Sequence, residues 1–185
     1  AVRESDARID VVLREQETLL ALGRAAEFRD HATLDHTIRV ARYTAIMCEE
    51  LMEDERQRQH ISYAAPLHDI GKLGIPESIL LKPGPLTPEE WDTIHTHTTI
   101  GHRILADGRS MYLTMGASIA LTHHERFDGS GYPRRLAGTA IPIEGRILAV
   151  ADVFDALISP RPYKPAWDFA RSFSHIAEKR GTMFD

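Results

Sequence analysis

The residues best suited to chemistry lie in one short stretch, Leu67-His68-Asp69-Ile70-Gly71-Lys72. If this stretch is helical, Lys72 lies one turn after His68 and Asp69, on the same face. A neutral imidazole and a carboxylate suit iron, manganese, nickel or zinc, and an aspartate can bridge two such ions. The stretch therefore indicates a metal site. A buried Asp69–Lys72 ion pair beside a packed histidine is the equally simple alternative.

Further histidines and acidic residues stand on other predicted helices. With the first stretch they form a set of five histidines and two aspartates, namely His36, His68, Asp69, His97, His123, His124 and Asp152. A helical bundle can bring such side chains together in its core. Seven ligands, with Asp69 able to serve two ions, favour a dinuclear site of nitrogen and oxygen coordination. Iron is the first expectation, and manganese, nickel and zinc stay open because ligand type does not separate them.

The elements that must position these residues are helices. Apolar spacing predicts helices over 9–27, 34–52, 61–72, from 88 past 101, 110–124, 144–157 and 166–179. Thr87-Pro88-Glu89-Glu90 is a helix start with a capping threonine. We expect no strands beyond one small hairpin near 135–141, in the loop rich in Gly, Tyr and Pro. The predicted fold is an all-α, single-domain helical bundle.

The first predicted helix is amphipathic, since apolar side chains alternate with Arg and Glu. Its apolar residues are Ile9, Val12, Leu13, Leu19, Leu20 and Leu22. This face could pair with a second copy of the chain or pack on the domain, and the pattern favours neither. We expect residues 1–28 to form a linker or dimerisation helix and residues 29–185 the functional domain. A sensory or receiver domain is expected upstream, and the end at Asp185 is expected to be truncated.

Composition limits the classes of partner. The formal net charge of −5 lacks the basic excess of a general nucleic-acid binder, whose affinity depends on neutralised phosphates. The single cysteine, Cys48, excludes an intrachain disulfide and a thiolate-rich zinc site. The sequence has no apolar run long enough to span a membrane. We therefore expect a cytoplasmic protein.

Taken together, the motifs resemble those of the HD-GYP family of cyclic di-GMP phosphodiesterases, a branch of the HD superfamily of metal-dependent phosphohydrolases. The resemblance extends from Arg29 to Asp185. The matching motifs are Asp35-His36-Thr37-Ile38-Arg39-Val40, His68-Asp69-Ile70-Gly71-Lys72, Leu73-Gly74-Ile75-Pro76, His97-Thr98-Thr99-Ile100-Gly101, His123-His124-Glu125-Arg126-Phe127-Asp128-Gly129-Ser130-Gly131-Tyr132-Pro133, Ala151-Asp152-Val153-Phe154-Asp155-Ala156-Leu157 and Arg161-Pro162-Tyr163-Lys164.

The resemblance implies an HD-type bundle and a role for each matched residue. One metal would be held by His36, His68, Asp69 and Asp152, and the other by Asp69, His97, His123 and His124. A hydroxide activated by the metals would attack cyclic di-GMP and give linear pGpG, and a further cleavage to GMP stays open. Asp69 and Lys72 would be catalytic, with Lys72 stabilising charge at the attacked phosphate. Arg161 and Lys164 would bind the substrate phosphates.

The same family pattern also implies what to expect of residues outside the proposed site. Many members carry a glutamate four residues before the first histidine, where this chain has Ala32, so we expect two metals rather than three. Asp155 should orient a ligand or a basic residue, and Tyr132 receives no catalytic role. The remaining histidines are expected at the surface or in packing, and they are His31, His60, His95, His102 and His175.

Other functions remain open at this point. The chain could be a weakly active or inactive sensor of cyclic dinucleotides, or a module that docks a diguanylate cyclase domain through the loop around Tyr132. It could also hydrolyse cyclic GMP-AMP or linear pGpG, because the side chains that would read the bases are not evident from the sequence.

Overall fold

The computed structural model describes residues 2–29, 35–160 and 165–185, with the side chains of the first range described from Asp10 onward. Within these ranges every regular element is helical, which confirms the all-α prediction. In chain order the elements are α1 (Val2–Phe28), α2 (His36–Leu51), α3 (Glu55–Ala64), η1 (Ala65–Leu67), η2 (Ile70–Gly74), α4 (Glu77–Leu80), α5 (Pro88–His95), α6 (His97–Leu105), α7 (Met111–Thr122), η3 (Gly138–Ala140), α8 (Ile143–Ile158) and α9 (Phe169–Glu178). Here η marks a 3₁₀ helix.

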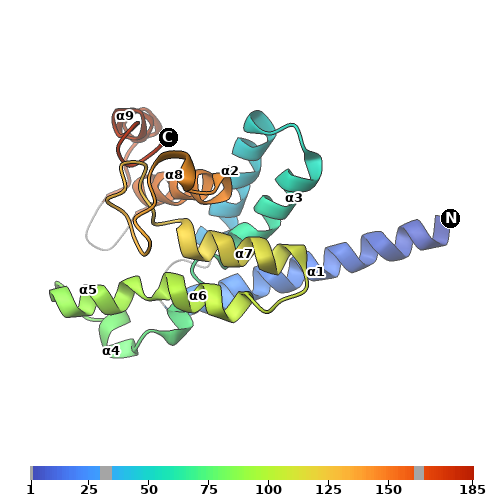
Figure 1. Cartoon of the computed structure of the whole chain (residues 1–185), viewed down its shortest axis with the longest axis horizontal. Helices are drawn as coiled ribbons and strands as arrows, with labels where there is room; N and C mark the ends of the chain where they lie inside the picture. The colour runs from blue at the N-terminus through green and yellow to red at the C-terminus, as the bar shows by residue number, and fades with distance from the viewer. Residues whose placement is uncertain (1, 30–34, 161–164) are drawn as a thin grey trace.

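Two clusters of apolar side chains form the core, and α7 contributes to both. The first cluster joins α2, α3, α7 and α8, and its largest members include Val40, Ile61, Ile119 and Leu148. The second joins α1, η1, η2, α6 and α7 and includes Leu19, Ala26, Leu67, Ile70 and Leu105. Figure 1 shows α7 between α8 and α6, where it touches both groups of helices. None of the described helices is both long enough and apolar enough to cross a lipid bilayer.

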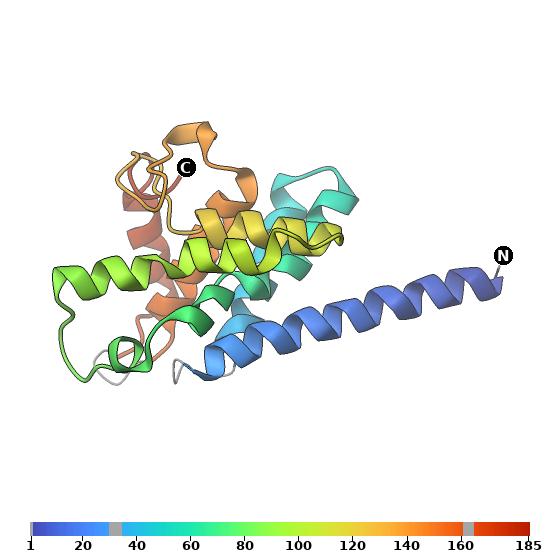
Figure 2. The ribbon, with the colours of Figure 1, turned by 60° about the horizontal axis from the view of Figure 1, so that its bottom comes forward.

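The two halves of the long helix α1 differ in how far they are buried. Its C-terminal half packs on the domain, where Leu19 and Ala26 are buried. Its N-terminal half extends beyond the other helices (Figure 2), and Val11 and Leu13 there are 60% and 50% exposed. Packing on the domain therefore accounts for one half of the amphipathic pattern. Dimerisation through the exposed half stays a prediction.

The prediction of one continuous helix over 61–72 is wrong. Helix α3 ends at Ala64, and two short 3₁₀ segments, η1 and η2, follow. Pro66 lacks the N–H that a continuous α-helix would use, and its ring crowds the preceding turn. Asp69 lies between the two segments with φ −101° and ψ 10°, and the N–H of Lys72 donates to the Asp69 carbonyl oxygen at 2.9 Å. The tighter turn still places Lys72 beside Asp69.

Two other local predictions met different outcomes. The capping box at Thr87 is confirmed, because its hydroxyl accepts from the Glu90 N–H while the Glu90 carboxylate accepts from the Thr87 N–H. The helix that begins there stops at His95, and α6 starts after Thr96. In the region of the expected hairpin, the structure has only a single antiparallel bridge, Asp128 to Ala137, and the η3 turn.

Close contact between η2 and α6 depends on glycine. A methyl group at Gly71 would lie 1.8 Å from the carbonyl oxygen of His97 and 2.5 Å from the amide nitrogen of Gly101. No side chain fits at that distance, so only glycine lets these two segments pack so closely. This approach places Asp69, two residues before Gly71, beside His97 at the start of α6.

Substitution of Gly71 tests this packing. We expect Gly71→Ala to lower the free energy of unfolding of the metal-free protein by about 3 kcal/mol, because a backbone atom must move to admit the methyl group. Gly101→Ala should change it much less, since its nearest neighbour is the Ala120 Cβ at 3.0 Å and alanine favours helix. Urea unfolding measures both. Equal effects of the two substitutions would contradict the account.

Candidate metal centre

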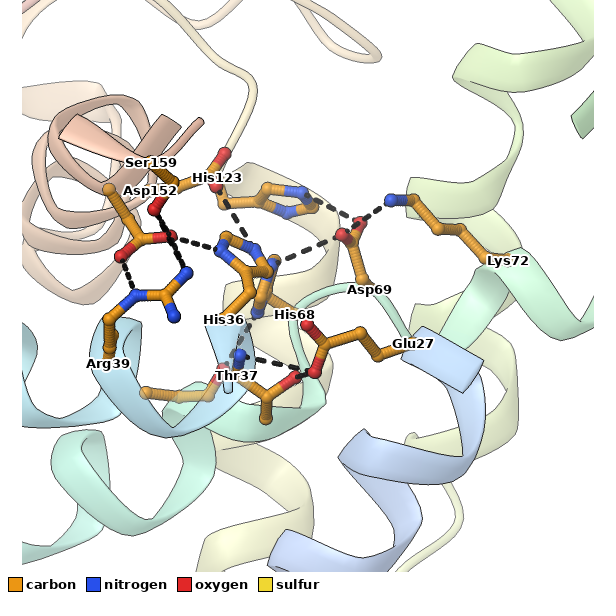
Figure 3. Close-up of polar contacts among 12 residues, drawn as sticks. Glu27, His36, Thr37, Arg39, His68, Asp69, Lys72, His123, Asp152 and Ser159 are labelled. Carbon is orange, nitrogen blue, oxygen red and sulfur yellow. Dashed lines mark hydrogen bonds and ion pairs between the residues drawn. The ribbon is translucent and has the colours of Figure 1, made fainter. Parts of the chain in front are cut away.

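The predicted metal ligands come from five separate segments, and most lie at a helix end. His36 is the first residue of α2, and His97 is the first residue of α6. His68 and Asp69 lie between η1 and η2, His123 and His124 directly follow α7, and Asp152 lies within α8. Figure 3 shows His36, His68, His123 and Asp69 directed toward a common centre.

The structure brings six of the seven predicted ligands into two overlapping groups. In each group the ligand atoms all lie within 4.8 Å of one another. One group is Asp69, His97, His123 and His124, and the other is His36, His68 and Asp69. Asp69 therefore belongs to both groups. The seventh residue, Asp152, lies beside the second group, with its Oδ1 3.5 Å from the Nε2 of His36.

Backbone carbonyls orient the imidazole rings. The Nδ1 atoms of His68, His97 and His123 lie 3.0, 2.6 and 3.1 Å from the carbonyl oxygens of Ala65, Ile94 and Ile119 respectively. Each carbonyl belongs to the helical turn just before its histidine. Because a carbonyl oxygen only accepts, each Nδ1 carries a hydrogen and is turned away from the centre. The three Nε2 atoms are thus directed toward the centre.

Two buried polar atoms at this centre fit a metal ion. The His68 Nε2 and Asp69 Oδ1 are buried and have no hydrogen-bond partner among the described residues. Buried polar atoms nearly always have a hydrogen-bond partner, so two buried atoms without one need an explanation. Nearby, the Asp69 Oδ1 lies 3.4 Å from the Nε2 of His97 and 3.8 Å from that of His123. A divalent ion with nitrogen and oxygen ligands would satisfy these atoms.

Burial and nearby charges hold most of these groups in the protonation state that can bind a metal ion. Burial lowers the pKa of His97 to about 4 and also lowers the pKa of His124, so both rings are neutral at pH 7. Burial alone would raise the pKa of Asp69, but Lys72 and His68 hold it well below its ordinary value. The Lys72 Nζ lies 2.8 Å from the Asp69 Oδ2, so the predicted ion pair is present within the ligand cluster.

His68 differs from the other rings. Burial would lower its pKa, but the charge of Asp69, with a contribution from Asp152, raises the pKa to about 9. Without metal this imidazole therefore keeps a second proton at neutral pH. A metal ion that binds there must displace that proton.

Asp155 orients His36, and this prediction is confirmed. Its carboxylate lies 2.7 Å from the His36 Nδ1, and Arg39 donates to the same carboxylate through Nε at 2.6 Å and Nη2 at 2.9 Å. Arg39 also donates to the Ser159 hydroxyl at 3.0 Å. A carboxylate on Nδ1 leaves the His36 Nε2 to face the centre, as is usual behind a metal ligand.

The loop that carries Tyr132 packs directly on the ligands. The Tyr132 ring lies between His124, at a centroid distance of 4.8 Å, and His95, on which it stacks at 3.8 Å. Gly131 permits the approach, because a methyl group there would lie 2.5 Å from the His124 carbonyl oxygen. Buried Glu125 holds the loop in place by accepting from two of its backbone N–H groups.

The prediction that His95 has a packing role is confirmed, because its ring stacks on that of Tyr132. One other residue near this centre is not evident from the sequence. Glu27 was given no role, yet its carboxylate is buried beside the start of α2. The one signal for Glu27 was its position on the same face of α1 as Leu19, Gly23 and Ala26. The predicted positions Ala32, Arg161 and Lys164, and also His31, lie outside the described residues.

The Asp155 contacts predict a pH-dependent stability. Burial would raise the pKa of Asp155, but hydrogen bonds from His36 and Arg39 outweigh it and lower the pKa to about 2. A lowered pKa in the folded state means that the contact stabilises the protein above about pH 4 and that this stability is lost as the pH falls toward 2. We expect Asp155→Asn to lose about 3 kcal/mol of unfolding free energy at pH 7.

Thermal or urea unfolding across pH checks this. The difference between the wild type and Asp155→Asn should shrink between pH 4 and pH 2, while exposed Asp92→Asn should match the wild type throughout. A constant difference at every pH would contradict the assignment.

Comparison with known proteins agrees with this geometry. The HD domain family matches residues 20–185. The chain is 51% identical over 168 residues to a cyclic di-GMP phosphodiesterase of Thermotoga maritima, covering 91% of this chain and 46% of that protein. It is 48% identical over 176 residues to the cyclic di-GMP phosphodiesterase response regulator RpfG of Xanthomonas campestris, covering 95% and 47%. The chain thus spans about half the length of these curated relatives.

A solved structure shares the fold. A crystal structure of a cyclic GMP-AMP-specific phosphodiesterase of Vibrio cholerae, V-cGAP3, aligns with a TM-score of 0.68 at 19% identity, covering 92% of this chain and 45% of that one. The family match covers most of the chain, and the relatives named cyclic di-GMP phosphodiesterases confirm the resemblance seen in the motifs. The chain belongs to the HD domain family.

Proposed function

We propose that this chain is a metal-dependent phosphodiesterase that hydrolyses cyclic di-GMP to linear pGpG, with GMP as the product of a second cleavage. The observation that carries the proposal is the position of Asp69, which lies in both ligand groups and pairs with Lys72 at 2.8 Å. The names of the relatives from T. maritima and X. campestris supply the substrate.

The donor set fits two divalent ions. His36, His68, Asp69 and Asp152 would hold one ion, and Asp69, His97, His123 and His124 would hold the other. When bound, such ions make water a better nucleophile and stabilise charge on phosphate oxygens. Iron is our first choice, with manganese, nickel or zinc as alternatives, because imidazole and carboxylate ligands without thiolate suit all of them.

The side chains of the protein orient the ligands and neutralise charge. Carbonyl oxygens and Asp155 accept from the Nδ1 atoms, which fixes the rings before any ligand binds. Lys72 keeps Asp69 ionised and presents an ammonium group at the edge of the cluster. A fixed positive group at that place would stabilise the charge that develops on an attacked phosphate.

Other parts of the proposal rest on the sequence. Arg161 and Lys164 would bind the substrate phosphates, and Tyr132 would border the substrate without taking part in the chemistry. Residues 1–28 would act as a linker or as a dimerisation helix before the phosphohydrolase domain at 29–185. A sensor or receiver domain upstream and a diguanylate cyclase remain candidate partners, in the cytoplasm.

A second substrate, cyclic GMP-AMP, has its own support. The chain is 41% identical over 181 residues to the 3'3'-cGAMP-specific phosphodiesterase 2 of V. cholerae, covering 96% of this chain and 34% of that protein. Cyclic GMP-AMP and cyclic di-GMP differ in one base, so the same phosphodiester chemistry serves both. The higher identity to the cyclic di-GMP enzymes makes cyclic di-GMP the first choice.

A hydrolysis assay tests the proposed activity. We expect cyclic di-GMP to be cleaved with Mn(II) or with Fe(II) under anaerobic conditions, faster than cyclic GMP-AMP or pGpG. Asp69→Ala should abolish turnover because both ligand groups lose a member. Lys72→Met should lower kcat about 10²–10³-fold while metal content is kept, and exposed Lys179→Met should leave kcat unchanged. Binding of the dinucleotide without metal-dependent cleavage would favour a sensor or docking module instead.

The metal count is a separate prediction. A methyl group at Ala32 cannot ligate, so we expect two ions per chain. Elemental analysis of anaerobically purified protein measures the ratio directly, and His124→Ala should lower it by one ion. A stoichiometric third ion in the wild type would refute the prediction.

A further inference from the structure

The start of helix α2 lacks a capping side chain of its own. The first N–H groups of a helix have no partner within it, and a side chain just before the helix usually accepts from one of them. Here Asp35 precedes α2, but its side chain makes no capping hydrogen bond. Its backbone, with φ −91° and ψ −14°, is already helical, unlike that of most capping residues.

A carboxylate from another helix takes the place of the cap. The Thr37 N–H donates to the Oε2 of Glu27 at 3.2 Å, and the Thr37 hydroxyl donates to the same oxygen. Glu27 lies in the last turn of α1, and both side chains are buried, at 4% and 2% exposure. A negative charge at a helix N-terminus is favourable, and burial strengthens the effect.

This contact lies next to a proposed metal ligand. Thr37 directly follows His36, so Glu27 fixes the backbone of His36 while Asp155 fixes its ring. Figure 3 shows Glu27 approaching Thr37 from α1, below the side chains of His36, His68 and Asp69. Two independent anchors therefore determine where the Nε2 of His36 points.

The same end of α1 also holds the segment that carries the other ligands. Arg29 donates to the carbonyl oxygen of Leu73 and, at 3.3 Å, to that of Ile75, at the end of η2. Gly23 packs on η1, where a methyl group would lie 2.3 Å from the Pro66 carbonyl oxygen. The end of α1 thus joins the start of α2 to the segment around His68 and Asp69.

We propose that Glu27 is a positioning residue that keeps His36 in the ligand group of His68 and Asp69. The inference rests on the proposed metal site. If Glu27 has this role, its substitution should weaken the binding of one ion only. The second group has His97 from α6 and His123 and His124 from the end of α7, together with Asp69. Within the described part of the chain, none of these four residues shares a hydrogen bond with Glu27.

The test is Mn(II) binding by metal-free protein, followed by electron paramagnetic resonance. The wild type should bind two ions. Glu27→Ala should weaken one site at least tenfold and leave the other unchanged, as His36→Ala should. Glu27→Gln should lie between, because its amide oxygen still accepts from Thr37 but carries no charge. Exposed Glu17→Ala, on the same helix, should match the wild type.

Folding is checked separately, because Glu27 is buried. Circular dichroism and the melting temperature of each metal-free variant show whether it is folded at the titration temperature. If Glu27→Ala does not fold, Thr37→Val and Thr37→Ser test the same contact from its other side. Loss of the hydroxyl in Thr37→Val should weaken the same site, and Thr37→Ser should restore it.

The outcomes separate this inference from the proposed function. Two ions bound to the wild type and equally to the Glu27 and Thr37 variants would overturn the positioning role alone. Parallel weakening of both sites would indicate a general structural role and would also overturn it. A wild type that binds no Mn(II) would overturn the metal site, and this inference with it.

Discussion

The structure depends on one constraint, the burial of a carboxylate among several imidazoles. Asp69 would be unfavourable in such a place if it were alone, because burial penalises its charged form. Lys72, at 2.8 Å, keeps it ionised. The surrounding rings direct Nε2 atoms at the same centre because their Nδ1 atoms are bound to carbonyl oxygens. Two buried atoms of this cluster, the His68 Nε2 and the Asp69 Oδ1, have no hydrogen-bond partner among the described residues, and a divalent cation would satisfy both.

The rest of the fold serves to bring distant segments to this carboxylate. Short helical segments end or begin at the ligands, so each side chain is held by a fixed backbone rather than by a long loop. Gly71 allows η2 to lie against α6, and Gly131 allows the Tyr132 loop to lie against His124. The C-terminal end of helix α1 contacts two of these segments, the start of α2 and the segment around His68 and Asp69. These contacts prepare the site in advance, which is what electrostatic catalysis requires.

Much of this was predictable from residue types and spacing. Histidines and aspartates on separate apolar helices predicted that these side chains converge, and matching them to the family motifs gives the proposed ligand set. The capping box at Thr87 followed from local rules, and the orienting role of Asp155 followed from the family pattern. Local rules fall short where tertiary packing decides. Pro66 marks a break in the helix, but the contact of η2 with α6 and the stack of His95 on Tyr132 join segments that are far apart in the chain.

Glu27 shows the same limit more clearly. In the sequence it is one glutamate among several on an amphipathic helix, and only the fold brings it to an uncapped helix start. The central claim, that Asp69 is shared by two ions, is tested most directly by anomalous diffraction from crystals loaded with Mn(II). The account predicts two peaks roughly 3.5–4 Å apart, one on each side of the Asp69 carboxylate. A single peak, or a pair that Asp69 does not contact, would contradict it.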